Sequence, residues 1–244
     1  MQPDADEPSE TWLGWAHPGL PGSGLAAEVV AALPAATPGP PWHAQIDAVL
    51  WAHRRTASAT QTLPPGLRAR TLGPTIAGFV RYRDTPVGSY HEVLASPTLV
   101  GGGLARLHIP FIAVDALASL HAGRAHWALP KTLASFTGDP TPGGSIAAQG
   151  DGWSVRATVT TRGPTLPAWL RISLAQWWPD GSVRHFPATF RGRLRVGRVH
   201  VEATKEAAVA GWLRSGHHLG VHLSQTRLRL PLPRRTAERG SLDR

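Results

Sequence analysis

The sequence predicts a mainly β protein, an antiparallel barrel or sandwich with a few helical insertions. Two observations lead to this prediction. Segments rich in β-branched and aromatic residues recur along the chain between Gly and Pro residues. In the basic segments near the C-terminus, charged and apolar residues alternate with the period of two that a strand with one buried face requires.

The predicted strands begin after a Pro-rich stretch and continue to residue 230. They are residues 44–53, 74–83, 89–95, 153–162, 168–177, 185–203 and 217–230. The Pro-Asp-Gly-Ser sequence at 179–182 predicts a turn between the strands on either side of it.

Helices are predicted in three places. Residues 24–33 are compatible with a short helix, and residues 204–216 begin with an acidic turn and end at Gly216. Residues 114–124 place the group Val114, Leu117, Ala118 and His121 on one face. This helix is predicted to end at Gly123, because glycine readily adopts the left-handed conformation of a C-terminal cap.

The composition of the termini predicts the domain limits. Residues 1–40 are rich in Pro, Gly and acidic side chains and are expected to be a flexible extension that ends in the Pro-rich linker 34–41. We expect a single domain over residues 41–233, followed by a basic tail at 234–244.

The formal net charge of +9 raises the question of nucleic-acid binding. Much of the excess lies in two alternating segments, with Arg191, Arg193 and Arg195 in one and Arg227 and Arg229 in the other. Their partners in the alternation include Leu194, Val196 and Leu228. Strands with one solvated face explain this pattern, so we expect no nucleic-acid partner.

No membrane partner, cofactor or metal ion is expected. The acidic N-terminus is unlike a secretory signal, so a cytoplasmic protein is predicted. Cysteine is absent, and the His91-Glu92 pair lacks the second histidine of a zinc-binding H-E-x-x-H motif. No phosphate-binding loop, dinucleotide fingerprint or hydrolase elbow in a strand–turn–helix setting is present.

Lysine is rare in this chain. Of 25 cationic residues, all but Lys131 and Lys205 are arginine. A neutral lysine amine can attack a carbonyl carbon, which an arginine cannot do. Lys131 lies within the apolar group Trp127, Leu129, Leu133 and Phe136, and burial among apolar side chains favours the neutral amine. The alternative is that Lys131 is an ordinary lysine.

Several motifs in order resemble the acetoacetate decarboxylase family. They are Pro-Pro-Trp-His at 40–43, Tyr-x-Glu at 90–92, Pro-Phe and Val-Asp within 110–115, Gly-Arg at 123–124, and Pro-Lys at 130–131. The resemblance covers residues 40–136. It implies a closed or cone-like antiparallel barrel with helical insertions, and it implies Schiff-base chemistry in which Lys131 is the nucleophile.

The family's site residues are transferred position by position. Glu92 matches the active-site carboxylate, and Arg124 matches the arginine of Gly-Arg. Arg124 either binds substrate or satisfies carbonyl groups near the end of its helix. The substrate-binding residues are predicted to be Arg124, Tyr90, Trp127 and Leu129. The chain departs from the family at Ala125, where the family has glutamate, and at Thr132, where it has a second lysine.

The resemblance therefore implies a lyase that acts on a small keto acid. It leaves two outcomes open: decarboxylation of a β-keto acid such as acetoacetate, or aldolase–dehydratase chemistry on a pyruvate-like substrate. A homo-oligomer is expected. Two other classes remain as alternatives, a non-catalytic ligand-binding barrel of the same fold and a nucleic-acid-binding protein that uses the Arg-rich strands.

Overall fold

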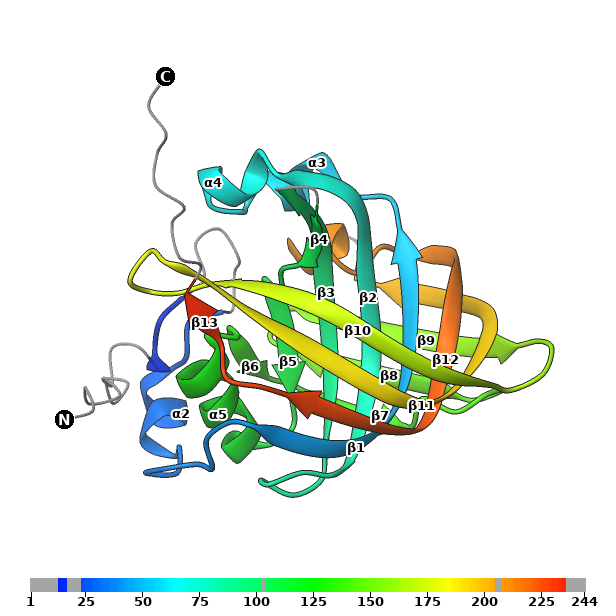
Figure 1. Cartoon of the computed structure of the whole chain (residues 1–244), viewed down its shortest axis with the longest axis horizontal. Helices are drawn as coiled ribbons and strands as arrows, with labels where there is room; N and C mark the ends of the chain where they lie inside the picture. The colour runs from blue at the N-terminus through cyan, green and yellow to red at the C-terminus, as the bar shows by residue number, and fades with distance from the viewer. Residues whose placement is uncertain (1–12, 17–22, 102–103, 205–207, 236–244) are drawn as a thin grey trace.

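The computed structural model describes residues 13–16, 23–101, 104–204 and 208–235 (Figure 1). It is built mainly from strands, which confirms the predicted fold class. The predicted domain limits at residues 40 and 233 stay a prediction, and Lys205 lies outside the described residues. Within the described ranges, no helix is both long enough and apolar enough to cross a bilayer.

The central feature is a closed ring of strands (Figure 1). Its members are β1 (Trp42–His53), β2 (Thr71–Asp84), β3 (Tyr90–Gly101), β4 (Leu104–Leu107), β10 (Leu166–Trp177), β11 (Val183–Ala203) and β12 (Gly216–Leu230). The ring closes because β10 pairs with both β4 and β11. Neighbouring strands are antiparallel, apart from one parallel contact between β4 and β10.

Further strands extend this ring. They are β5 (Phe111–Val114), β6 (Lys131–Leu133), β7 (Ser135–Gly138), β8 (Ser145–Gly150), β9 (Trp153–Thr161) and β13 (Arg234–Arg235). Strands β9, β8 and β7 continue outward from β11, and β13 also pairs with β11. Strand β5 is antiparallel to β3 and parallel to β6, so it joins the ring to the strand that begins at Lys131.

The helices are short. They are α2 (Ala27–Ala31), α3 (Ala57–Gln61), α4 (Pro65–Arg68), α5 (Leu117–Trp127) and the 3-10 turn η1 (Ala208–Gly211). Helices α2 and α5 lie at the same end of the ring, near β5 and β6 (Figure 1). Of the predicted helix at 204–216, the described part contains only η1.

Strands β1, β2 and β3 are buried on both faces. Ile46, Ala48 and Val80 belong to an apolar cluster inside the ring, whereas Trp51 and Phe79 belong to a second cluster on its outer side. Successive side chains of a strand point to opposite faces, so a strand between two cores needs apolar residues at nearly every position. This explains why the Ala-Val-Leu-Trp run at 48–51 shows little alternation.

The Arg-rich strands have the predicted solvated face over part of their length. Arg191, Arg193, Arg227 and Arg229 are exposed, and Leu228 is buried. The alternation also predicted that Val196 is buried. This prediction is wrong, because Val196 is 56% exposed. The buried face of β11 changes from even-numbered residues such as Ala188 to odd-numbered residues such as Val199, and Val196 lies where this change occurs.

The end of α5 differs from the prediction. The helix runs through Gly123 and ends at Trp127, followed by Ala128 in the left-handed conformation with φ 49°. The buried part begins at Ser119 and includes nearly every later residue of the helix, instead of the predicted face that contains Leu117 and Ala118. This burial arises because α5 packs between β5, β6 and the segment that precedes β1.

Candidate active site

Lys131 is held on a rigid stretch of backbone between α5 and β6. The left-handed residue Ala128 ends the helix, and the Leu129 N–H donates to the carbonyl of Gly123 at 3.0 Å. Pro130 then restricts the backbone directly before Lys131. Lys131 pairs with Ile112 of β5, and its side chain is buried.

Glycine at position 123 makes room for this side chain. A Cβ atom there would lie 2.5 Å from Cδ and 2.7 Å from Cε of Lys131. Such distances are far below van der Waals contact, so any larger residue would displace the lysine. Gly123 therefore serves the packing of Lys131 against α5 and is not the helix cap that its sequence context suggested.

The amine of Lys131 lies beside a carboxylate and a hydroxyl group. Its Nζ is 2.8 Å from Oε2 of Glu92 and donates a hydrogen bond to Oγ of Ser119 at 2.9 Å. The side chains of Lys131 and Glu92 are 4% and 3% exposed, so water screens this pair very little. The short distance allows a proton to pass directly between the amine and the carboxylate.

Two tyrosines complete the polar cluster. The Tyr82 hydroxyl donates to Oε1 of Glu92 at 3.2 Å, and the rings of Tyr82 and Tyr90 stack with centroids 4.2 Å apart. The amine of Lys131 lies 5.0 Å from the centre of the Tyr90 ring. Burial, followed by the Glu92 carboxylate, raises the pKa of both tyrosines well above the usual value. Both phenols therefore remain protonated near neutral pH.

These groups face a cavity inside the ring with a volume of about 110 Å³. Lys131, Glu92, Tyr82 and Tyr90 line one part of it. Trp127 and Leu129, two of the predicted substrate-binding residues, also line it. The tertiary structure thus places Lys131, Glu92, Tyr90, Trp127 and Leu129 around one cavity, although their roles stay a prediction.

Arg124 lies outside this group. It is buried, but it does not line the cavity. Its Nε donates to the carbonyl of Lys131 at 2.8 Å, and its terminal nitrogens donate to the carbonyls of Leu13, Trp15 and Ser23. Burial lowers the pKa of Arg124 to about 10, so the guanidinium remains charged at neutral pH. These bonds connect the N-terminal segment to the backbone of Lys131.

We expect Arg124→Lys to lower the free energy of unfolding by about 2 kcal/mol or more. A lysine lacks the planar fork of donors, and buried carbonyls that lose a partner cost about 1–3 kcal/mol each. Chemical denaturation measures the change, and Arg171→Lys on an exposed position of β10 is the matched control. If the stability is unchanged while ligand affinity falls, Arg124 is a substrate-binding residue instead.

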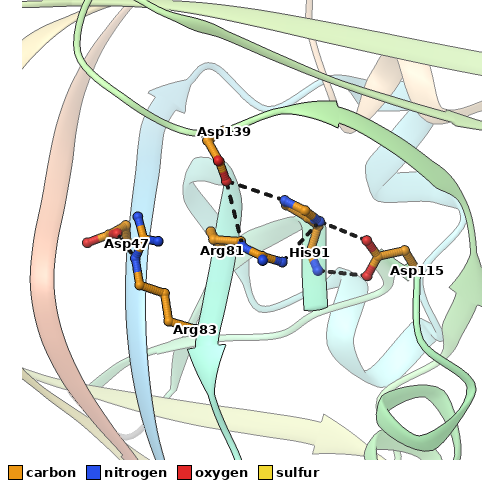
Figure 2. A network of polar contacts seen from close by, with 6 residues as sticks. All are labelled: Asp47, Arg81, Arg83, His91, Asp115 and Asp139. Carbon is orange, nitrogen blue, oxygen red and sulfur yellow. Dashed lines mark hydrogen bonds and ion pairs between the residues drawn. The ribbon is translucent and has the colours of Figure 1, made fainter. Parts of the chain in front are cut away.

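A second polar cluster lies on the opposite face of β3 (Figure 2). The Asp115 carboxylate accepts hydrogen bonds from the backbone N–H of His91 and contacts its Nδ1, both at 2.7 Å. The other ring nitrogen of His91 is 3.4 Å from Asp139, which also lies 3.7 Å from Nε of Arg81. Since His91 precedes Glu92, this cluster ties the strand that carries Glu92 to the end of β5.

Figure 2 also shows an ion pair between Asp47 of β1 and Arg83 of β2. The Asp47 carboxylate accepts a further hydrogen bond from the backbone N–H of Gln225 at 2.9 Å. Gln225 has a positive φ of 49°, and the pairing of β1 with β12 shifts register at this point. Asp47 therefore links three neighbouring strands where their ladder is interrupted.

Three polar residues that line the cavity or contact the Lys131 amine were not predicted as site residues from the sequence. In the sequence, Ser119 is one polar residue within a helical pattern, and Ser96 lies directly after a predicted strand, so neither is marked as a site residue. Tyr82 carried a usable signal, because the chain has two tyrosines and a buried tyrosine requires a hydrogen-bond partner. The sequence also offers Arg54, Arg55, Arg68 and Arg70 as candidates to bind a substrate carboxylate, and all four are exposed.

In the described ranges, no group of three or more histidine and carboxylate side chains is placed to hold a metal ion. The neighbouring rings of His200 and His217 stack with centroids 4.4 Å apart. His217 and His218 follow one another in β12, and Nε2 of His218 contacts the Arg214 carbonyl at 2.8 Å.

Comparison with known proteins gives a consistent picture of the fold. The family model described as acetoacetate decarboxylase matches residues 32–228, which includes the C-terminal half that the motifs do not reach. Among curated proteins, none matches this sequence significantly.

Solved structures resemble the chain at low sequence identity. An acetoacetate decarboxylase structure aligns with a TM-score of 0.62 at 13% identity, covering 87% of this chain and 98% of the other. The acetoacetate decarboxylase from Legionella pneumophila aligns with 0.58 at 17%, covering 84% and 93%. The enduracididine biosynthesis enzyme MppR complexed with pyruvate aligns with 0.57 at 17%, covering 81% and 91%. At these identities the likeness shows a shared fold.

Proposed function

Because the chain belongs to the acetoacetate decarboxylase family, we propose that Lys131 forms a Schiff base with the carbonyl carbon of a small keto acid. One observation supports this most directly: the buried amine of Lys131 faces a cavity and lies 2.8 Å from the buried carboxylate of Glu92. A structural ion pair has no need of a cavity beside it. A nucleophilic lysine with a proton shuttle needs both the neighbouring carboxylate and a cavity that admits the substrate.

The proton between the two groups controls the first step. When Glu92 takes a proton from Lys131, the amine becomes neutral and the acid becomes a donor. The amine nitrogen then bonds to the carbonyl carbon as the C=O π bond breaks, and a proton moves from the nitrogen to the oxygen. Glu92 protonates the resulting hydroxyl so that water leaves. The product is a positively charged iminium beside the Glu92 carboxylate, which stabilises it electrostatically.

The iminium then draws electrons from a neighbouring bond. In a β-keto acid the bond to the carboxylate breaks, CO2 leaves, and the electron pair forms an enamine. A proton taken up from water through Glu92 is added to the enamine carbon, and hydrolysis releases the ketone and Lys131. In a pyruvate-like substrate a proton leaves instead, and the enamine carbon bonds to an aldehyde. The Ser119 hydroxyl orients the amine in both routes.

Reductive trapping tests the proposed function. The protein is incubated with acetoacetate or pyruvate and sodium borohydride, which reduces an iminium to a stable secondary amine. Peptide mass spectrometry is expected to find the added mass on Lys131 and on no other residue. Absence of labelling with either acid, in a folded protein, would support the non-catalytic binding barrel.

We expect Gly123→Ala to slow trapping at least about tenfold while the protein remains folded. The added methyl group would overlap Cδ and Cε of Lys131 and move its amine away from Glu92 and Ser119. Alanine stabilises a helix interior by up to about 1 kcal/mol relative to glycine, but overpacking a buried site costs about 1–3 kcal/mol, so the free energy of unfolding should fall modestly. Trapping rates and denaturation curves measure the two effects.

The control for this variant is Gly66→Ala in α4, where an added Cβ meets nothing within 4 Å. It should leave the trapping rate unchanged. Normal trapping by Gly123→Ala would show that the position of the lysine amine relative to Glu92 is unimportant for the chemistry.

A further inference from the structure

The cavity is apolar beyond the Lys131 cluster. Its remaining walls come mainly from aliphatic and aromatic side chains on the ring strands, among them Leu50, Ile76, Leu94, Ile172 and Phe190. Among the described residues that line it, Lys131 is the one cation. A bound molecule thus meets charge at one end of the cavity and hydrocarbon along the rest.

Ser96 marks the far end of the cavity. It lies on the same face of β3 as Glu92 and Leu94, four residues beyond Glu92. A strand rises about 3.3 Å per residue, so the two positions are about 13 Å apart. Ser96 is 1% exposed, and its hydroxyl has no hydrogen-bond partner among the described residues.

From these features we propose that the site prefers 3-oxo acids with an apolar chain of several carbon atoms on the carbonyl, directed toward Ser96, over acetoacetate. This inference rests on the proposed Schiff-base function and specifies its substrate class. The carbonyl carbon bonds to Lys131 beside Glu92, and the chain takes the place of water along Leu94, Ile76 and Leu50.

The absence of another cation along the described lining favours decarboxylation. A carboxylate in apolar surroundings is poorly solvated unless a cation or hydrogen-bond donors stabilise it. In a 3-oxo acid the carboxylate is lost as neutral CO2, which removes this cost during the reaction. A pyruvate-like substrate keeps its carboxylate throughout an aldol route, so the same cavity gives that route no advantage.

A chain-length series tests the inference with the wild-type protein. The acids are 3-oxobutanoate (acetoacetate), 3-oxohexanoate and 3-oxooctanoate, with pyruvate for comparison. We measure kcat/KM for CO2 release together with the rate of borohydride labelling of Lys131. Each added methylene that leaves water should raise kcat/KM about fourfold, so 3-oxooctanoate should exceed acetoacetate on the order of 100-fold. Pyruvate should label more slowly than 3-oxooctanoate.

A variant that shortens the cavity locates the chain. Ser96→Leu adds hydrocarbon at the far end and removes a hydroxyl that has no partner, so no hydrogen bond is lost. The ratio of kcat/KM for 3-oxooctanoate to that for acetoacetate should fall at least about tenfold, the value of roughly two excluded methylenes. Ser58→Leu, on the exposed face of α3, is the matched control and should leave the ratio unchanged.

The results separate the inference from the proposed function. No labelling of Lys131 with any of the acids would contradict the proposed function itself. Labelling and CO2 release that do not increase with chain length would contradict the substrate class while leaving the function intact. Labelling without CO2 release, or preferential labelling by pyruvate, would contradict decarboxylation. If Ser96→Leu does not fold, the wild-type series still decides.

Discussion

Lys131→Arg is expected to abolish Schiff-base labelling and to reduce turnover of a keto acid on the order of 10⁶-fold, the scale seen when an enzyme loses its nucleophile. Arginine preserves the positive charge beside Glu92 and is able to donate to the carboxylate through two nitrogens. A guanidinium stays protonated and forms no Schiff base with a carbonyl carbon. The substitution therefore removes the nucleophile and keeps the ion pair.

The experiment compares wild type and variant with borohydride and the same keto acid, while circular dichroism and denaturation report the fold. Lys205→Arg, at the chain's other lysine, is the matched control and should label like the wild type. Equal labelling of wild type and Lys131→Arg would show that Lys131 is an ordinary lysine. Loss of labelling by Lys205→Arg would move the nucleophile to the other lysine.

Glu92→Gln is expected to slow both labelling and turnover by about 10²–10⁴-fold, the usual contribution of a general acid–base. The amide keeps the shape of the side chain, but a donor NH2 group replaces one of the two oxygens that Tyr82 and Lys131 contact, and the amide cannot take up the lysine proton. The buried ammonium also loses its counter-charge, and removal of one partner of a buried pair lowers the free energy of unfolding by about 3–5 kcal/mol.

Glu92→Gln and Lys131→Arg are distinguished by whether the nucleophilic amine is still present. Glu92→Gln keeps the nucleophile, so borohydride should still label Lys131 slowly, whereas Lys131→Arg should give no label at any time. Glu202→Gln, on an exposed position of β11, is the control and should not change either rate. An unchanged labelling rate in Glu92→Gln would show that a group other than Glu92 accepts the lysine proton.

The long strands were predictable because their local pattern agrees with their environment. The Arg-Leu alternation at 227–230 marks a strand with one solvated face, and the Pro-Asp-Gly-Ser turn joins β10 to β11 as expected. Short strands such as β5 and β6 were missed. Each is only a few residues long, and each exists because it pairs with a partner that is distant in the chain or separated by α5.

Local signals failed where a distant side chain decides the structure. Gly123 has the sequence context of a helix end, but the helix continues to Trp127, and the glycine makes room for the Lys131 side chain. Arg124 was predicted from its motif as a substrate-binding or helix-end residue. Its bonds to carbonyls of Leu13, Trp15 and Ser23 depend on a segment about a hundred residues away.

The sequence by itself determined the mainly β class, the family, and the two residues expected to carry the chemistry. Rare residue types in a fixed order can be recognised without knowledge of the fold. Only the tertiary structure decided that Tyr82 and Ser119 bind Glu92 and Lys131, that Arg124 lies outside the cavity, and that Ser96 lines it. These facts follow from strand pairing and from which face of each strand turns inward. Both depend on contacts between residues far apart in the chain, and no local pattern encodes such contacts.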